Sequence, residues 1–577
     1  MNKILTLAGL ALAGVALTGC DDFLNDNRYP LTSIVNTPEY WSNPSNCQLQ
    51  VDRNIDFMPA YGTGGGQNGW FYFKTLNDDQ VGSTFADWAY PTAMPKVDEW
   101  DYSWVRGTNY IINGVYGSSM SVSNKANYLA IARLQRAIAY YRLVRMFGDV
   151  VWENEPVDPA DTEILKGPRT DRDIVMDSVL NDLKFAVEHI AQAKSAQSWS
   201  RDLAKAVLSE VALYEGTFCK YRTQADNGKA PDATRAEKFL RECANASEAL
   251  LASYGFRDDF KSIYNSTWNE TDGINGTKIT ALSANPELIF GREYNSVNGL
   301  NSLISFTASS TTTSGMSLDA FKSFLFRDGK PAATTSLDNT LVGVPVGTTG
   351  LSIQNLLDVR DARLSCTTDP YVYYQNMTWS RAGTTGMNSS SGFGVAKYDN
   401  IDLPVVNRQN SAQNYTSAPL YWTSYIACNY AEAKAELGEF DQAAFNKSLK
   451  KLYERAQLPI SGPADLSAIN DPANNMGVSS LLWEIRRCRR CELMFDNWIR
   501  YWDLIRWHQL DKLDNSKYPD VLLGAYMANS PVSIDNKNGY VDGSKGMTRK
   551  YDPKYYLYPI PTEQLDLNPE LGKNPGW

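Results

Sequence analysis

Apolar residues recur at three- and four-residue spacings in several stretches of the chain, and this pattern predicts amphipathic helices. In residues 126–150, Leu129, Tyr140 and Val144 lie on one such stripe, and Gly148 marks its end. The same pattern predicts helices over residues 172–194, 201–221 and 233–254 and, in a second block, over residues 417–438, 440–458 and 478–497. Short loops separate these helices, which indicates tetratricopeptide-like helical pairs, although the repeat of about 34 residues is not sustained. The sequence therefore predicts a mainly α-helical scaffold.

The segments outside these two helical blocks lack such periodicity. Residues 21–50 are polar, and we interpret them as a tether that enters the fold. Residues 60–110 are dense in aromatic residues, and their glycines and prolines predict loops. Residues 256–416 are dominated by Gly, Ser, Thr and Asn, with short β-like pieces at 287–294 and 371–379. A loop-rich segment of this length usually carries a function or forms a subdomain.

The first residues of the chain have the pattern of a secretory signal, in which Lys3 is followed by an uncharged apolar run up to Thr18. This run is shorter than the roughly 20 residues that a membrane-spanning helix needs, and no later stretch approaches that length. The sequence LTGC at 17–20 resembles a bacterial lipobox, in which the cysteine becomes the acylated first residue of the mature protein. An ordinary signal peptide with an incidental cysteine is the alternative. We expect residues 1–19 to be removed and a lipid on Cys20 to anchor the protein.

The composition excludes several classes of function. The net charge of −10 and the pI near 5.1 oppose binding to nucleic acid, which requires a basic surface. Seven cysteines follow Cys20, and this odd number in a long chain excludes a small disulfide scaffold. The two histidines, His189 and His508, argue against a histidine-based zinc site or catalytic triad. We expect neither metal nor cofactor, with a structural calcium ion left open. Aromatic residues make up 12% of the chain, which favours stacking on sugar rings as well as core packing.

Residues 485–508, IRRCRRCELMFDNWIRYWDLIRWH, combine six arginines with a C-x-x-C motif. If the segment is placed on a helix, its apolar residues fall in one sector, which contains Leu481, Ile485, Cys488, Cys491 and Phe495. Both cysteines are therefore expected to pack as small apolar residues. A zinc site would need a second pair of Cys or His ligands, which the segment does not offer, and a thioredoxin-type redox site would need the first cysteine at the start of a helix. Acidic partners for the arginines are Glu484, Glu492, Asp496 and Asp503. We interpret the segment as a wall of the scaffold, with Trp498, Trp502 and Trp507 as packing residues.

Five segments resemble segments of the SusD/RagB family and follow the family order along the chain. They are RLQRAIAYYRLVRMFGDVVW (133–152), SANPELIFGREY (283–294), YAEAKAELGEF (430–440), IRRCRRCELMFDNWIRYWDLIRW (485–507) and YLYPIPTEQLDLNPELGKNPGW (556–577). Each similarity is weak alone, but together they extend over nearly the whole chain. Cys488 departs from the family pattern, which usually has an acidic residue between the two arginine pairs.

This resemblance implies a SusD-like fold, in which loops are inserted over tetratricopeptide-like helix pairs. It also implies an outer-membrane lipoprotein that caps a SusC-like TonB-dependent transporter and delivers oligosaccharide or polysaccharide, without being an enzyme. Some family members deliver peptides instead. The start Cys20-Asp21-Asp22 is similar to the acidic surface-export signal of such lipoproteins, which indicates exposure on the cell surface, with a periplasm-facing lipoprotein as the alternative.

On this basis we expect residues 20–577 to form a single SusD-like domain. Its expected parts are the tether and aromatic ligand loops (20–125), the first helical pairs (126–255), the loop-rich insertion (256–416), the second helical pairs (417–510) and the C-terminal tail (511–577).

In the family the ligand site comes mainly from the N-terminal aromatic loops and from the inserted region. The first candidate group for stacking against sugar rings is Trp70, Trp88, Tyr90, Trp100 and Trp104. Candidates for hydrogen bonds to sugar hydroxyls are Asn77, Asp78, Asp79 and Arg106. The second group, from the inserted region, is Trp268, Tyr294, Tyr374 and Trp379. For each aromatic residue the alternative is buried support without ligand contact.

Three other functions stay open at this point. A surface glycoside hydrolase would need two carboxylates about 5–9.5 Å apart, and the pairs Asp78/Asp79 and Glu99/Asp101 supply the residue types. A peptide-binding member of the family would differ in its ligand alone. A tetratricopeptide adaptor would bind no small molecule. The sequence favours nutrient binding over catalysis, mainly through the family resemblance.

Overall fold

The structure is a computed structural model of the chain. It describes residues 37–58, 76–82, 89–158, 160–269, 279, 281–294, 314–374, 389–404, 406–407, 415–496, 499–531 and 537–577. Helices dominate these residues, and none of the helices within them is both long and apolar enough to cross a membrane. The predicted mainly α-helical class is confirmed.

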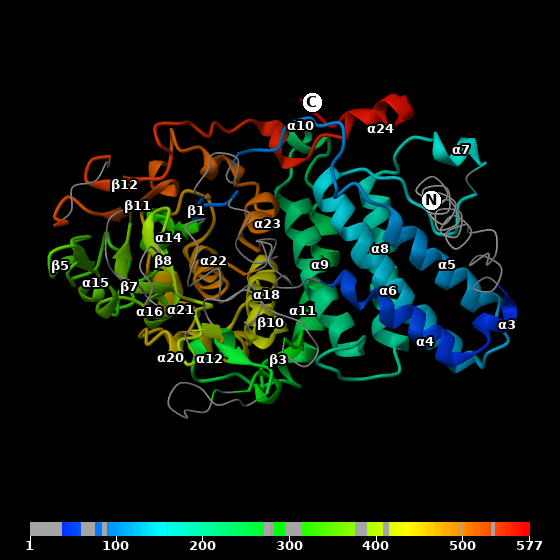
Figure 1. The fold of residues 1–577 in the computed structure, drawn as a ribbon, viewed down its shortest axis with the longest axis horizontal. Coiled ribbons are helices and arrows are strands. Elements are labelled where there is room, and N and C mark those ends of the chain that lie inside the picture. Colours follow the sequence, from blue (N-terminus) through cyan, green and yellow to red (C-terminus); the bar gives the residue numbers. More distant parts are fainter. Residues whose placement is uncertain are drawn as a thin grey trace, which may run out of the picture.

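The first helical block consists of five long helices that pack on one another in chain order (Figure 1). They are α5 (Ser103–Gly117), α6 (Val122–Phe147), α8 (Arg172–His189), α9 (Arg201–Tyr221) and α11 (Ala233–Leu251). Side-chain oxygens that accept from backbone N–H groups cap α6, α8, α9 and α11, and they belong to Ser121, Asp171, Ser200 and Asp232. Gly148, with φ 74°, ends α6 where the sequence predicts its end.

The second block continues the stack, because α18 (Thr423–Glu436) packs on α11 and then on α22 (Ser480–Glu492). Its other helices are α19 (Gln442–Lys447), α20 (Lys450–Arg455), α21 (Pro463–Ala468) and α23 (Ile499–Arg506). The helix predicted over 440–458 is divided into α19 and α20. At the break, the Ser448 hydroxyl donates to the Ala444 carbonyl at 2.7 Å and competes with the helical backbone bond.

Two segments that the sequence predicts to be irregular are helical. In the predicted tether, α4 (Pro44–Arg53) forms because Asn43 caps it, Pro44 occupies its first turn, and Cys47 and Val51 are buried. In the predicted loop region, α5 forms despite three glycines. A Cβ on Gly114 would lie 2.2 Å from the Trp41 ring, so this glycine permits close packing and is no helix breaker.

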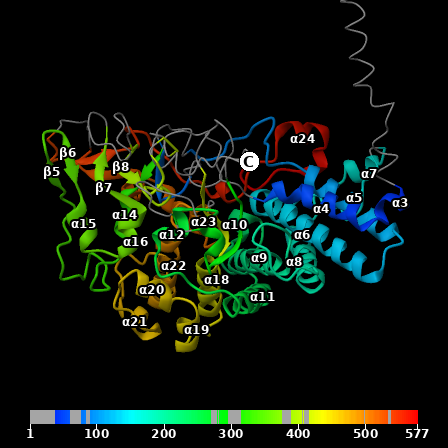
Figure 2. The ribbon, with the colours of Figure 1, turned by 60° about the horizontal axis from the view of Figure 1, so that its bottom comes forward.

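Short antiparallel strands lie in the region between the blocks, as the sequence predicts, and further strands precede the first block and follow the second. The strand pairs are β1 (Gln80–Gly82) with β4 (Ser314–Met316), β2 (Ser266–Thr267) with β9 (Thr416–Ser417), β3 (Leu288–Gly291) with β10 (Pro419–Trp422), and β11 (Leu523–Tyr526) with β12 (Tyr540–Asp542). A four-stranded sheet has the order β5 (Val344–Val346), β6 (Gly350–Ser352), β7 (Thr368–Tyr373) and β8 (Gly392–Val395). Figure 2 shows β5–β7 and α3–α8 at opposite ends of the molecule. Because β10 pairs with β3, the helix predicted over 417–438 begins only at Thr423.

The remaining helical elements are single turns or slightly longer. They are α3 (Pro38–Trp41), η1 (Asn54–Phe57), α7 (Thr162–Leu165), α10 (Gln224–Asn227), α12 (Lys261–Tyr264), η4 (Leu282–Ala284), α14 (Leu318–Ser323), α15 (Gln354–Asp358), α16 (Ala362–Thr367), η5 (Leu510–Leu513), η6 (Pro519–Val521), η7 (Pro553–Tyr556), α24 (Thr562–Leu567) and η8 (Pro569–Leu571). One hydrophobic core joins side chains from both helical blocks and from the inserted region.

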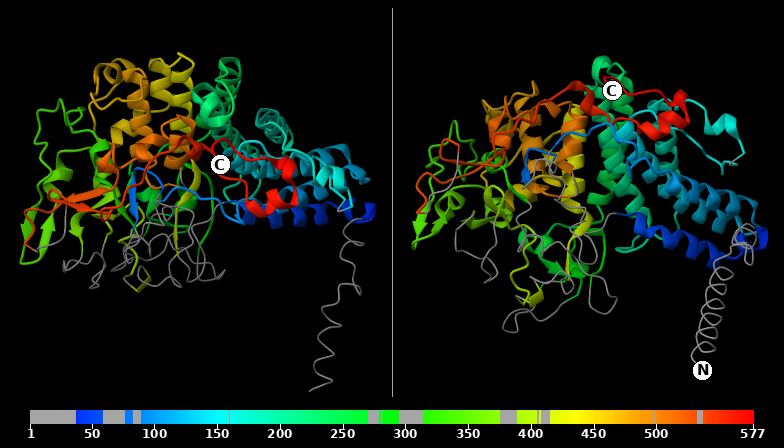
Figure 3. Two further views of the ribbon diagram at one scale, coloured as in Figure 1. Left: turned by 90° about the horizontal axis from the view of Figure 1, so that it is seen from above. Right: turned by 45° about the horizontal axis from the view of Figure 1, so that its top comes forward.

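The end of the C-terminal tail, which includes α24, lies across the first helical block (Figure 3). Arg169 fixes it there by donating to the Leu571 carbonyl at 2.6 Å and to Asn574 Oδ1 at 2.7 Å. Leu557 packs against Gly148, where a Cβ would lie 3.1 Å from Leu557 Cδ1. The last residues of the chain thus contact the segment before α8, which precedes them by about four hundred positions.

Candidate functional site

The two chain regions that carry the sequence-predicted ligand residues meet at a junction of three short strands. From the aromatic N-terminal region, β1 pairs with β4 of the inserted region in the register Gln80 to Met316. Another strand of that insertion, β8, packs on β4, and the Ser390 hydroxyl donates to the Val81 carbonyl. We call β1, β4 and β8 the strand junction. It joins regions that lie more than 230 positions apart.

The segment that enters the junction, residues 77–79, is buried and fixed by arginines. Asn77 Oδ1 accepts from the backbone N–H groups of Asp79 and Gln80, at 2.8 and 3.0 Å. Asp78 is fully buried and accepts two hydrogen bonds of 2.6 Å from Arg500 on α23. Burial alone would raise the pKa of Asp78, but the guanidinium groups of Arg490 and Arg500 outweigh it and hold this pKa well below its usual value. Asp78 is therefore a charged anchor of the junction.

Asp79 makes the equivalent contact to α22. Arg490 Nε donates to Asp79 Oδ1 at 2.7 Å, while burial and the neighbouring Asp78 charge raise the pKa of Asp79. Both carboxyl groups of this pair thus face arginines inside the protein, and the side chains of Asn77, Asp78 and Asp79 are at most 6% exposed.

Three of the aromatic candidates are also buried. The Tyr90 ring stacks on Tyr555 with 4.1 Å between centroids, and its hydroxyl donates to the Leu510 carbonyl at 3.3 Å. Trp268 is 8% exposed and packs in a small cluster with Leu282 and Leu288. Tyr294 is 1% exposed.

Four described candidates retain exposed surface. Trp100 packs edge-on against Phe147, and Trp104 lies 4.4 Å from the Phe57 ring, so each indole is half-buried. Arg106 is exposed on α5, which makes Trp104 and Arg106 helix residues and not the loop residues that the sequence predicts. Tyr374, directly after β7, is half-buried. The predicted residues Cys20, Trp70, Trp88 and Trp379 lie outside the described part of the chain.

Apart from Asn497 and Trp498, which lie outside the described residues, the arginine- and cysteine-rich segment is confirmed as an interior wall. Cys488 and Cys491 are each 1% exposed, carry free thiols, and burial raises the pKa of Cys491 to about 12. The arginines lie inside too, where Arg489 Nε bonds Asp503 at 2.8 Å and Arg486 bonds Glu436 at 2.7 Å. Both faces of α22 are therefore buried, one by apolar contacts and the other by ion pairs.

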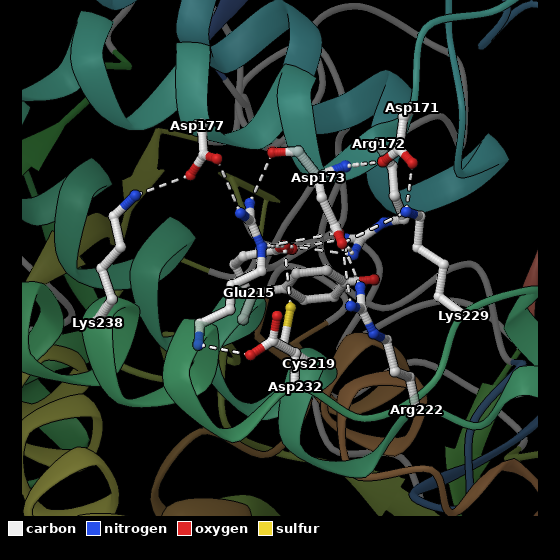
Figure 4. A network of polar contacts seen from close by, with 12 residues as sticks. Asp171, Arg172, Asp173, Asp177, Glu215, Cys219, Arg222, Lys229, Asp232 and Lys238 are labelled. Carbon is white, nitrogen blue, oxygen red and sulfur yellow. Dashed lines mark hydrogen bonds and ion pairs between the residues drawn. The ribbon is translucent and has the colours of Figure 1, made fainter.

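A second ion-pair network joins α8, α9 and α11 (Figure 4). Asp173, Glu215 and Cys219 place ligand-type atoms within 4.8 Å of one another, as a metal site would. However, Arg172 donates to Glu215 at 2.6 and 3.3 Å, and Arg222 donates to Asp173 at 2.7 and 3.0 Å. Because guanidinium groups already neutralise both carboxylates, this network serves to hold the helices together.

The structure also contains a cavity of about 500 Å³ beside the junction, which sequence reasoning missed. It is bounded by α14, α22, α23, the turns η5 and η6 and the segments 331–333 and 471–476, and Asp78, Arg490 and Arg500 lie in its wall. Trp483 and Lys512 also contribute to the wall, and Lys512 Nζ lies 5.0 Å from the centre of the Trp483 ring. The sequence carries no signal for this cavity, because its residues come from distant segments that each have the pattern of scaffold.

Helical pairs with short-strand insertions over one scaffold define a tetratricopeptide-type protein, and the comparisons with known proteins agree. Over residues 293–577 the chain matches the sequence profile of the SusD family. A SusD-like protein of Bacteroides ovatus is 26% identical over 276 residues, which are 44% of this chain and 46% of that protein. The match thus spans about half the length of this curated relative.

Solved structures extend the similarity of the fold to nearly the whole chain. A SusD-like carbohydrate binding protein from Bacteroides fragilis is 18% identical with a TM-score of 0.66, covering 92% of this chain and 100% of that one. Surface glycan-binding protein A from Bacteroides fluxus is 14% identical with a TM-score of 0.57, covering 93% and 100%. The chain thus resembles the SusD family in sequence over residues 293–577 and has the fold of SusD-like proteins over nearly its whole length.

Proposed function

We propose that this protein captures oligosaccharide or polysaccharide at the cell surface and passes it to a SusC-like TonB-dependent transporter. The observation that carries the proposal is the strand junction, which brings the N-terminal aromatic region and the inserted region together on a rigid helical support. Binding residues on loops over such a scaffold keep their positions without ordering costs at each encounter. The glycan-binding names of two structural relatives point to the same ligand class.

The ligand contacts that we propose follow from the chemistry of sugars. Pyranose rings present C–H faces that pack on indole and phenol rings, while side-chain amides and guanidinium groups bond the hydroxyls. Trp100, Trp104 and Tyr374 are half-buried, and the first two contact the rings of Phe147 and Phe57. Trp70, Trp88 and Trp379 are further candidates from the sequence.

The location that we propose depends on Cys20. A lipid on this cysteine would hold the protein at the outer membrane, with the binding face exposed to the medium. We also propose that the protein performs no catalysis. Asp78 and Asp79 are engaged by Arg500 and Arg490, and Asp101 accepts from the Ser103 backbone N–H at 2.8 Å at the start of α5.

The test uses protein that begins after Cys20 and affinity gels containing plant, host or microbial polysaccharides. Retention by one polysaccharide class, without released product, is the expected result. The variants Trp100→Ala, Trp104→Ala and Tyr374→Ala should each weaken retention, since one stacked ring contributes roughly 1 kcal/mol. Tyr116→Ala is the matched control, because Tyr116 is an aromatic residue of α5 that is 60% exposed and outside the candidate groups.

Two outcomes would contradict the proposal. Release of oligosaccharide from the samples would show catalysis. Absence of retention by every polysaccharide, together with binding of peptides in the same assay, would move the function to peptide capture.

A further inference from the structure

We propose that the 500 Å³ cavity beside the strand junction is a separate binding site for a sugar carboxylate, namely a hexuronate unit. The site is distinct from the aromatic candidates of the proposed function and does not rest on them. Its volume lies within the range of about 300–1,000 Å³ that is usual for small-molecule clefts.

Lys512 on η5 lies at the wall of the cavity. No carboxylate of the described residues lies within 4.0 Å of its Nζ, which instead lies over the Trp483 ring at 5.0 Å from the centroid. The charged groups that face it are Asp319 from α14, Arg490 from α22, Arg500 from α23 and Asp78 from the segment before β1. Burial, together with the two arginines, lowers the pKa of Lys512 to about 8 against the opposing effect of the two carboxylates.

The other cations of the cavity wall already have acidic partners among the described residues. The pairs are Lys322 with Asp520, Arg486 with Glu436, Arg487 with Asp471 and Glu484, Arg490 with Asp79 and Asp319, and Arg500 with Asp78. Within this wall Lys512 is thus the cation that a ligand anion can pair with, without displacing a protein carboxylate. A bound carboxylate would restore the charged form that burial disfavours.

The rest of the wall suits a hydroxylated ring. Trp483, Tyr518 and Met476 supply half-buried apolar surface. The Asn475 amide nitrogen lies 3.4 Å from the Tyr518 hydroxyl, and the Asp520 carboxylate is 34% exposed. Both side chains can therefore form hydrogen bonds with ligand hydroxyls. A carboxylate for Lys512 combined with hydroxyls for these groups is the chemistry of a uronic acid.

The test is isothermal titration calorimetry of the protein with D-galacturonate and D-glucuronate. D-galactose, D-glucose and acetate serve as probes that lack either the carboxylate or the ring. At least one uronate should bind more tightly than its neutral sugar and than acetate. Lys512→Met should weaken uronate binding about 10- to 100-fold, the range expected for a hydrogen bond to a charged group. Lys517→Met, at an exposed lysine of the same segment, should leave it unchanged.

A second measurement needs no variant. At pH 8 about half of the Lys512 side chains are neutral, and a bound carboxylate raises the lysine pKa, so binding should take up close to half a proton per site. Titrations in phosphate and in Tris should therefore give different heats at pH 8 and nearly the same heat at pH 6.

Three results would overturn the assignment. If neutral sugars bind as tightly as uronates, Lys512 does not pair with a ligand carboxylate. The same conclusion follows if the Lys512→Met variant binds uronate as tightly as the wild-type protein does. Acetate that binds as tightly as uronate would remove the sugar assignment. This proposal and the proposed function can fail independently of each other. Trp100→Ala and Trp104→Ala should leave uronate binding unchanged whether or not they affect polysaccharide retention.

Discussion

The ion pair between Asp78 and Arg500 gives the sharpest test of how this fold is held together. Two hydrogen bonds of 2.6 Å join the groups, and Arg490 Nη2 lies 3.3 Å from Asp78 Oδ2. At an effective dielectric constant near 20, unit charges 4 Å apart attract by about 4 kcal/mol. Removing one partner of a buried pair destabilises by about 3–5 kcal/mol, because the other charge stays buried. Asp78→Asn keeps one acceptor oxygen, so we expect a loss near 3 kcal/mol.

The assay is urea unfolding of the wild-type protein and of Asp78→Asn, followed by tryptophan fluorescence, with the slope of the transition compared between them. Glu242→Gln is the control, because its partner Lys184 is 53% exposed and such pairs contribute about 0–1 kcal/mol. The folded pKa of Asp78 is depressed, so its contribution is present above the unfolded pKa of about 3.9 and is lost as the pH falls below it. The difference in free energy of unfolding between the wild-type protein and Asp78→Asn should therefore shrink below pH 4.

Two results would refute this reasoning. Equal unfolding midpoints at pH 7 would mean that the buried pair contributes nothing net to stability. A gap that persists unchanged down to pH 3 would assign the loss to packing instead of charge.

Three further predictions follow from other buried groups. Burial raises the pKa of Asp496 to about 6, so the folded protein holds more protons than the unfolded chain between pH 4 and 6, and stability falls as the pH rises through that window. In urea titrations at pH 4, 5 and 6, the stability of the Asp496→Asn variant should not fall in this way. Parallel stability profiles of the variant and the wild-type protein would contradict this prediction. A Cβ on Gly524 would lie 1.9 Å from the Ser391 carbonyl oxygen. Gly524→Ala should therefore reduce the free energy of unfolding by about 1–3 kcal/mol through overpacking, and so lower the unfolding temperature. Gly107→Ala, which meets no atom within 4 Å, should not lower it. Seven cysteines lie in the described residues, and of these only Cys366 is incompletely buried. Protein that begins after Cys20 should therefore react quickly with at most one equivalent of a thiol reagent, and rapid reaction of more would show an opened core.

Much of the scaffold was predictable because helix formation leaves a local pattern. The predicted helix over 201–221 coincides with α9, and the end of α6 at Gly148 was visible as a glycine after an apolar stripe. The errors arose where tertiary contacts override local signals. The glycines of α5 permit close packing instead of breaking the helix, and pairing of β10 with β3 shortens the helix predicted from residue 417.

The candidate site was predictable only in part, for the same reason. Residue type suggested that Asp78 and Tyr90 face a ligand, but it could not show that each is buried against a partner more than four hundred positions away. The pairing of Trp483 with Lys512 in a cavity had no sequence signal, because the two residues belong to different elements, each with an ordinary scaffold pattern.

The sequence by itself determined the helical class, the order of the two blocks and the acidic net charge, since periodicity, glycine placement and charge act locally or as sums along the chain. The tertiary structure decided which polar residues are buried and paired. A buried guanidinium group must find hydrogen-bond acceptors nearby in space, and those partners can come from any part of the chain. Arg500 illustrates the point, because its partner Asp78 lies 422 positions earlier.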